Sequence, residues 1–93
     1  MKREEVRVKV LEALREVKIG ETPITDESKL ELDLGLDYLD IVELIMDIEW
    51  KLEIHIDDKE VEDMKTVGDV VKAVQDAVEK RDNGAPHAEQ EGV

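Results

Sequence analysis

The chain has 93 residues and no cysteine, and only 2% of its residues are aromatic. This length gives one small domain with an aliphatic core, and the lack of cysteine excludes disulfides and thiolate metal sites. The formal net charge of -13 makes nucleic acid an unsuitable partner, because phosphate binding needs a basic face. No run approaches about 18 apolar residues and the start lacks a signal-peptide pattern, so no membrane contact is expected and we predict a monomeric, cytoplasmic protein.

The acidic residues are concentrated in the middle of the chain. Residues 26–63 hold fifteen acidic and three basic residues, a net charge of -12, whereas residues 1–25 carry +1 and residues 64–93 carry -2. Such a charge complements a basic patch on another protein and speeds encounter at low salt. Solubility is the alternative explanation, because an acidic surface also keeps a small protein from associating.

A first helix is expected over residues 3–17, followed by a long loop. Apolar residues in the helix recur at a spacing that places them on one face: Val6, Val10, Leu11 and Leu14. In the loop, four apolar residues are expected to anchor the chain on the core: Ile24, Leu30, Leu32 and Leu34.

Asp37 is a suitable N-cap for a second helix that reaches about Leu52, and Asp40 can support the first turn. One apolar stripe is expected to face the core: Ile41, Leu44 or Ile45, Ile48 and Leu52. Further apolar residues stand among acidic ones and are candidates for a contact surface, namely Leu39, Met46 and Trp50. Val42 fits either set, since a small bundle can use a wide apolar arc.

A short helix is expected over residues 57–63, and a last helix follows it. Thr66 can cap that helix, with Asp69 three residues later as in a capping box. Its core face would hold five valines: Val67, Val70, Val71, Val74 and Val78. We predict a folded domain over residues 1–80 and a disordered tail over residues 81–93, which lack apolar periodicity.

The segment from Asp33 to Leu44 reads D-L-G-L-D-Y-L-D-I-V-E-L. Apart from its tyrosine, it resembles the attachment motif of acyl carrier proteins, D-L-G-x-D-S-L-D-x-V-E-L. The resemblance extends over roughly residues 3–79, since residues 43–46 and 65–70 are similar to further parts of that family. It implies an all-α four-helix bundle of three longer helices and one short helix, which acts in fatty-acid or related acyl-chain biosynthesis and is not an enzyme.

In that family the motif serine carries 4'-phosphopantetheine, and Tyr38 stands in its place. The phenolic oxygen lies on a rigid ring, farther from the backbone, so no cofactor is expected on the chain as written. Ser28 is the only serine and lacks the motif. Three interpretations stay open: a carrier-like protein that has lost its arm, a true acyl carrier whose attachment serine has been replaced by Tyr38, or chemistry of Tyr38 itself. The third is the weakest, because a tyrosine beside carboxylates is a poor nucleophile.

The resemblance also implies docking on basic-patch enzymes of acyl-chain synthesis, such as a ketosynthase, dehydratase or transferase. The expected docking residues lie on the second helix: Asp37, Leu39, Asp40, Glu43, Met46, Asp47 and Glu49. An acidic regulatory or decoy protein outside acyl metabolism is the alternative from a different class. No catalytic triad, phosphate loop or EF-hand pattern is present, and His55 and His87 are too far apart for a metal site.

Overall fold

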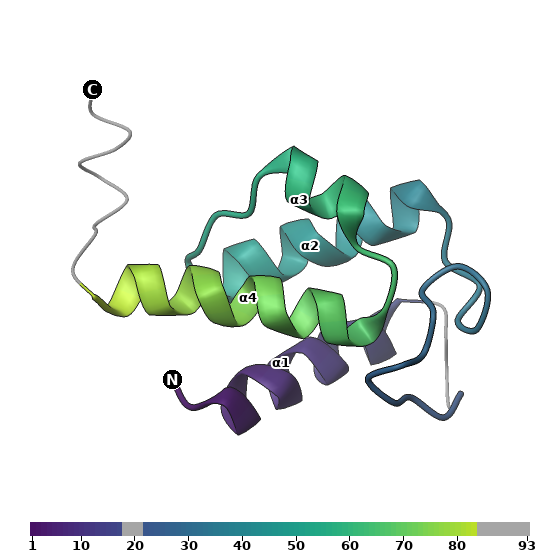
Figure 1. Cartoon of the computed structure of the whole chain (residues 1–93), viewed down its shortest axis with the longest axis horizontal. Helices are drawn as coiled ribbons and strands as arrows, with labels where there is room; N and C mark the ends of the chain where they lie inside the picture. The colour runs from purple at the N-terminus through teal and green to yellow at the C-terminus, as the bar shows by residue number, and fades with distance from the viewer. Residues whose placement is uncertain (18–21, 84–93) are drawn as a thin grey trace.

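The protein is described here by a computed structural model covering residues 1–17 and 22–83. Its elements are α1 (Arg3–Glu16), α2 (Tyr38–Leu52), α3 (Asp58–Asp63) and α4 (Val67–Asp82). The prediction of an all-α fold with three longer helices and one short helix is therefore confirmed. Helix α1 packs against both α2 and α4, and α3 packs on α2 (Figure 1). None of the helices in the described part is long and apolar enough to span a bilayer.

Helices α2 and α4 both begin with a reciprocal capping box; the sequence predicts the box at α4, and at α2 it predicts the Asp37 cap but not the return bond to Asp40. At α2, the Asp37 carboxylate accepts a hydrogen bond from Asp40 N at 2.9 Å, and the Asp40 carboxylate accepts one from Asp37 N at 3.0 Å. At α4, Thr66 Oγ1 accepts from Asp69 N at 3.2 Å, and Asp69 accepts from Thr66 N at 3.1 Å. Each box satisfies backbone N–H groups that have no partner within the helix, and this fixes where the helix starts.

The core is aliphatic, as expected. The five predicted valines of α4 are buried, and α2 buries both Leu44 and Ile45 rather than one of them. Val42 and Leu11 are half-buried against this core. Side chains from the loops and from α3 complete it, including several that the periodicity did not mark: Leu36, Ile54, Ile56, Val61 and Met64.

One predicted core anchor is wrong: Leu32 is 80% exposed, while its neighbours Leu30 and Leu34 are buried. The loop turns sharply here, because Asp33 N and Leu34 N both donate to the Lys29 carbonyl. A carboxylate oxygen of Asp33 also accepts from Lys29 N at 2.8 Å. The turn places Leu32 at its outer edge. Leu32 is therefore exposed, although it alternates in the sequence with the buried Leu30 and Leu34.

The loop before α2 is tied to the start of α4. Leu30 N donates to the Lys65 carbonyl at 2.9 Å, and Gly68 N donates to the Asp26 carbonyl at 2.9 Å. A Cβ at Gly68 would lie 3.2 Å from that Asp26 oxygen, so another residue there would require the loop to shift by a few tenths of an ångström. Gly35 has a φ of +69°, a left-handed conformation that lets the chain turn into α2. These contacts set the position of the α2 N-terminus.

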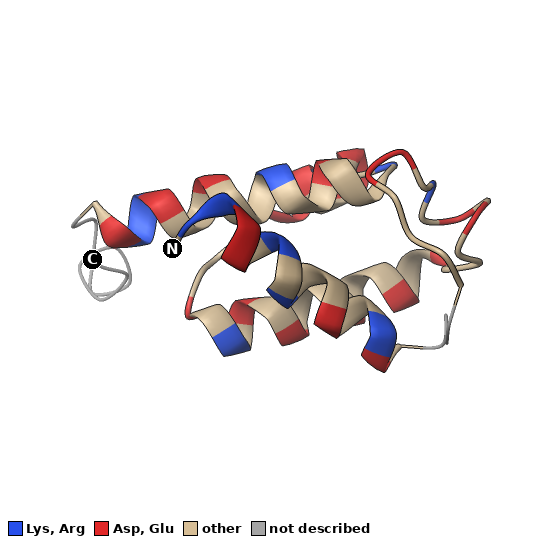
Figure 2. Ribbon diagram, turned by 90° about the horizontal axis from the view of Figure 1, so that it is seen from below, with Lys and Arg blue, Asp and Glu red and all other residues tan. Residues whose placement is uncertain are grey.

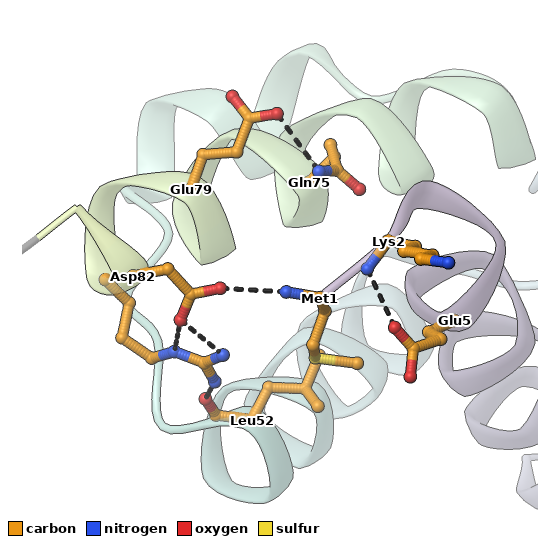
Figure 3. Close-up of polar contacts among 8 residues, drawn as sticks. Met1, Lys2, Glu5, Leu52, Gln75, Glu79 and Asp82 are labelled. Atoms are coloured by element: carbon orange, nitrogen blue, oxygen red, sulfur yellow. Dashed lines mark hydrogen bonds and ion pairs between the residues drawn. The ribbon is translucent and has the colours of Figure 1, made fainter.

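Helix α4 continues to Asp82, two residues beyond the limit predicted for the folded domain. The last residues have partners in the fold, which accounts for the extra length. The N-terminal ammonium of Met1 pairs with Asp82 at 2.9 Å, and the Arg81 guanidinium donates to the Leu52 carbonyl (Figure 3). The start of α1 and the end of α4 are thereby joined. The rest of the predicted tail, residues 84–93, lies outside the described residues.

Candidate functional site

Tyr38 is the first residue of α2, directly after the N-cap Asp37, and its side chain is 48% exposed. It borders an open groove of about 390 Å³ where the loop, α2 and α3 meet. The groove has an apolar wall and charged residues beside it: Leu30, Leu32, Ile41, Val61 and Met64, with Lys29, Glu31, Glu62 and Lys65. The first residue of a helix faces the positive end of the helix dipole, so a phosphate or another anion attached there would be favoured.

Ser28 lies in a different environment. It is buried in the loop, and its hydroxyl accepts a hydrogen bond from Thr25 N at 2.9 Å. Its backbone carbonyl accepts from Val67 N, the first residue of α4. The only serine of the chain therefore has a structural role and offers no accessible oxygen for modification.

Three of the apolar candidates form a straight stripe on the outside of α2. Leu39, Met46 and Trp50 are 69%, 60% and 84% exposed. At about 100° per residue, the three positions fall within about 40° of one another around the helix axis. Glu43 lies beside the stripe, is exposed, and makes no ion pair or hydrogen bond within the part of the chain that the structure describes. The fold thus brings Leu39, Glu43 and Met46 together on one face.

Unlike Glu43, the other acidic residues predicted to dock have partners within the part of the protein that the structure describes. Asp37 and Asp40 hold the capping box described above, and Asp47 pairs with Lys51 at 3.1 Å. Glu49 turns toward the segment after α2, where its Oε2 accepts from Ile56 N at 2.8 Å and lies 3.5 Å from His55 Nδ1. Glu49 therefore holds the α2–α3 connection, a role that helical spacing alone does not reveal.

Lys51 connects α1 to α2. Its ammonium group lies 2.8 Å from Glu16 of α1 and 3.1 Å from Asp47 of α2. The hydrogen bonds to Glu16 and then to Asp47 raise the pKa of Lys51 above its ordinary value. Figure 2 shows the wider charge distribution, with several basic residues on α1 and mostly acidic residues on α2 and the loop before it. Among the described residues, no group of three potential ligands is placed to hold a metal ion.

Comparison with known proteins assigns the family. Residues 8–74 match the sequence model of the family described as "Phosphopantetheine attachment site". The acyl carrier protein of Exiguobacterium sibiricum is 44% identical over 80 residues, which cover 84% of this chain and all of that protein. The acyl carrier protein of Clostridium perfringens is 50% identical over 64 residues, which cover 69% of this chain and 84% of that protein.

The fold agrees with the sequence comparison. A crystal structure of an acyl carrier protein from Thermotoga maritima superposes with a TM-score of 0.75 at 25% identity, covering 86% of this chain and 94% of that one. The matched sequence runs from within α1 through α2 and α3 to the middle of α4, and therefore includes the groove, Tyr38 and the outer face of α2. Members of this family bind 4'-phosphopantetheine and work with the enzymes of fatty-acid synthesis. This chain belongs to the acyl carrier protein family, and it is a carrier-type protein and not an enzyme.

Proposed function

We propose that this protein docks on enzymes of fatty-acid or related acyl-chain synthesis through α2 and does not carry 4'-phosphopantetheine as written. The observation that carries the proposal is Tyr38 at the first position of α2, where the family motif has its serine. The flanking Asp37, Leu39 and Asp40 match the motif, so the surroundings of the site are kept while the attachment atom has changed.

The residues present do not fit the covalent cofactor. Attachment makes a phosphodiester to a serine oxygen one bond from Cβ, close to the start of the helix. The Tyr38 oxygen lies at the far end of an aromatic ring that borders the groove. A transferase that aligns coenzyme A with the helix start would find the ring where the hydroxyl should be. Ser28 is no substitute, because it is buried and hydrogen-bonded.

The charge distribution supports docking on basic enzymes. Residues 26–63 carry a net charge of -12, and α2 with the loop before it holds much of it. On the outer face, Glu43 has no partner among the described residues and stands beside exposed Leu39 and Met46. A face of this kind combines charge for encounter with apolar area for contact. Basic patches of a ketosynthase, a dehydratase or the phosphopantetheinyl transferase would complement it.

The mass of the intact protein tests the first half of the proposal. After incubation with coenzyme A, Mg²⁺ and a broad-range phosphopantetheinyl transferase, the mass should be unchanged. The variant Tyr38→Ser should gain one phosphopantetheine arm under the same conditions, since the flanking motif is intact. A gain of one arm by the unaltered protein would overturn the proposal.

A charge reversal tests the second half. Glu43→Lys should slow association with an immobilised ketosynthase in surface plasmon resonance, because it removes complementary charge. Asp76→Lys is the matched control: Asp76 is an exposed acid on α4, with no ion pair or hydrogen bond among the described residues. Equal association rates for the unaltered protein, Glu43→Lys and Asp76→Lys would exclude α2 as the docking surface. That result would favour the alternative of an acidic regulatory or decoy protein outside acyl metabolism.

The groove beside Tyr38 favours one second candidate, a true acyl carrier whose attachment serine has been replaced by Tyr38. Its wall of Leu30, Ile41, Val61 and Met64 gives apolar area beside the attachment position although no arm is expected on Tyr38. Under this alternative, Tyr38→Ser would accept the arm and also be loaded with an acyl group and elongated by the pathway enzymes. A variant that takes the arm but is not elongated would favour a recognition module alone.

A further inference from the structure

Trp50 is the most exposed of the large apolar side chains in the described residues, although tryptophan is the costliest of them to leave in water. It continues the stripe of Leu39 and Met46 to the far end of α2, in the last turn of the helix. Single exposed apolar residues are common, but three in line along one helix form a surface for a partner. Trp50 is also the only tryptophan of the chain.

The surface beside Trp50 is hollowed. A depression of about 700 Å³ is lined by Trp50, by Lys9 of α1, and by the residues next to Trp50 at the end of α2: Glu49, Lys51, Leu52 and Glu53. Three of the charged groups there have partners inside the fold: Glu49 on Ile56 N, Lys51 on Glu16 and Asp47, and Lys9 on Glu12. The indole ring, which is 84% exposed, is therefore the main apolar group at this end that the fold leaves in solvent.

The two ends of the outer face differ in chemistry. Toward the N-terminus of α2, Glu43 offers a charge that has no partner among the described residues, and toward the C-terminus, Trp50 offers apolar area. A second copy of this chain is a poor occupant, since each copy carries a net charge of -13 and the two would repel. A basic enzyme surface with an apolar slot complements both ends at once.

We propose that Trp50 is the anchor of the α2 docking face and inserts into an apolar slot on a basic partner enzyme. The proposal rests on the docking function proposed above and extends it to the end of α2 remote from Tyr38. Trp50 lies twelve positions after Tyr38 in the helix, so the slot should lie about 18 Å from the point on the enzyme that faces Tyr38. Buried tryptophans dominate the energy of many interfaces, while surrounding contacts exclude water.

The single tryptophan gives a direct test. Protein labelled with 5-fluorotryptophan has one ¹⁹F resonance, which should shift or broaden when the purified ketosynthase of Exiguobacterium sibiricum fatty-acid synthesis is added. Trp50→Ala should weaken binding to this enzyme at least tenfold, mostly through faster dissociation, because anchors act on the dissociation rate. Trp50→Phe should recover much of the loss. Val8→Ala, an exposed apolar residue of α1, is the control and should bind as the unaltered protein does.

The outcomes separate this inference from the function on which it rests. Normal binding by Trp50→Ala together with weakened binding by Glu43→Lys would overturn the anchor and leave the docking function standing. If the unaltered protein did not bind the ketosynthase, both would fall. A ¹⁹F shift that depends on protein concentration without enzyme would place a second copy on Trp50, and would overturn the proposal. Circular dichroism of each variant checks that the helices are intact.

Discussion

Helices α2 and α4 start with the same capping box, but the first residue of α2 is exposed and the first residue of α4 is buried. Each has a capping box, yet the residue after the cap is exposed Tyr38 in α2 and fully buried Val67 in α4. The start of α4 is covered by the loop, through the bonds that Ser28 and Asp26 accept from Val67 N and Gly68 N. The start of α2 has the open groove beside it instead. Capping thus fixes where a helix begins, and the neighbouring segments decide whether its first residue packs or is available for function.

The same substitution at both positions should give the largest contrast. Val67→Ser should lower the free energy of unfolding by about 2–4 kcal/mol, because it removes buried methyl groups and leaves a hydroxyl in the core. Tyr38→Ser should change it by no more than about 0.5 kcal/mol, as is usual at exposed sites. Urea denaturation followed by circular dichroism measures both. Similar losses at the two positions would show that the starts of the two helices are equally packed.

Removal of the two N-caps should lower the free energy of unfolding by less than Val67→Ser does, and by different amounts at the two helices. Thr66→Ala should cost about 1 kcal/mol, the usual value for a lost N-cap. Asp37→Ala loses an equivalent hydrogen bond but also removes one charge from a strongly acidic region, so its net cost should be lower. Thr66→Ser and Asp37→Asn keep the capping oxygen and serve as controls. A greater loss for Asp37→Ala than for Thr66→Ala would mean that repulsion among the acids is already compensated.

Neighbouring acids on α2 should respond differently to charge reversal. Asp40→Lys breaks the bond that the carboxylate accepts from Asp37 N and opposes the helix dipole, so it should cost about 1 kcal/mol. Glu43→Lys, one turn away and without an internal partner among the described residues, should stay within about 0.5 kcal/mol. Thermal melting compares the two variants. Equal stability would mean that the Asp40 half of the capping box contributes nothing.

The C-terminal ends of the two helices should show the smallest effects, at opposite extremes of pH. Hydrogen bonds to Glu16 and Asp47 raise the pKa of Lys51, so its contribution is complete below the unfolded pKa and is lost as pH rises through the higher folded value. The N-terminal ammonium and Arg81 lower the pKa of Asp82, so its contribution is present above the unfolded pKa and is lost as pH falls through the lower folded value.

Melting curves across pH would resolve these two contributions. Lys51→Met should flatten the loss of stability at alkaline pH and leave the acid side unchanged. Asp82→Asn should do the reverse. Both shifts should be modest, because the groups are exposed and solvent screens them. A variant whose entire pH profile is displaced in parallel would indicate a packing effect and not a titrating group.

The sequence by itself determined the local features of this protein. The caps at Asp37 and Thr66 and the valines of α4 follow from signals within a few residues, where side-chain oxygens meet free N–H groups and apolar residues share a helical face. The attachment motif is likewise a pattern within a few residues, and it predicted the family. That Tyr38 takes the place of the motif serine stays a prediction.

Tertiary structure alone decided the features that join distant segments. Leu32 is exposed because a turn closed by Lys29 directs it outward, and Glu49 faces inward because Ile56 N, seven residues away, needs an acceptor. The groove at Tyr38 requires the loop, α2 and α3 together, and the depression at Trp50 requires Lys9 of α1. Such contacts depend on how helices pack, and packing depends on the fit of the whole core, which no short-range pattern specifies.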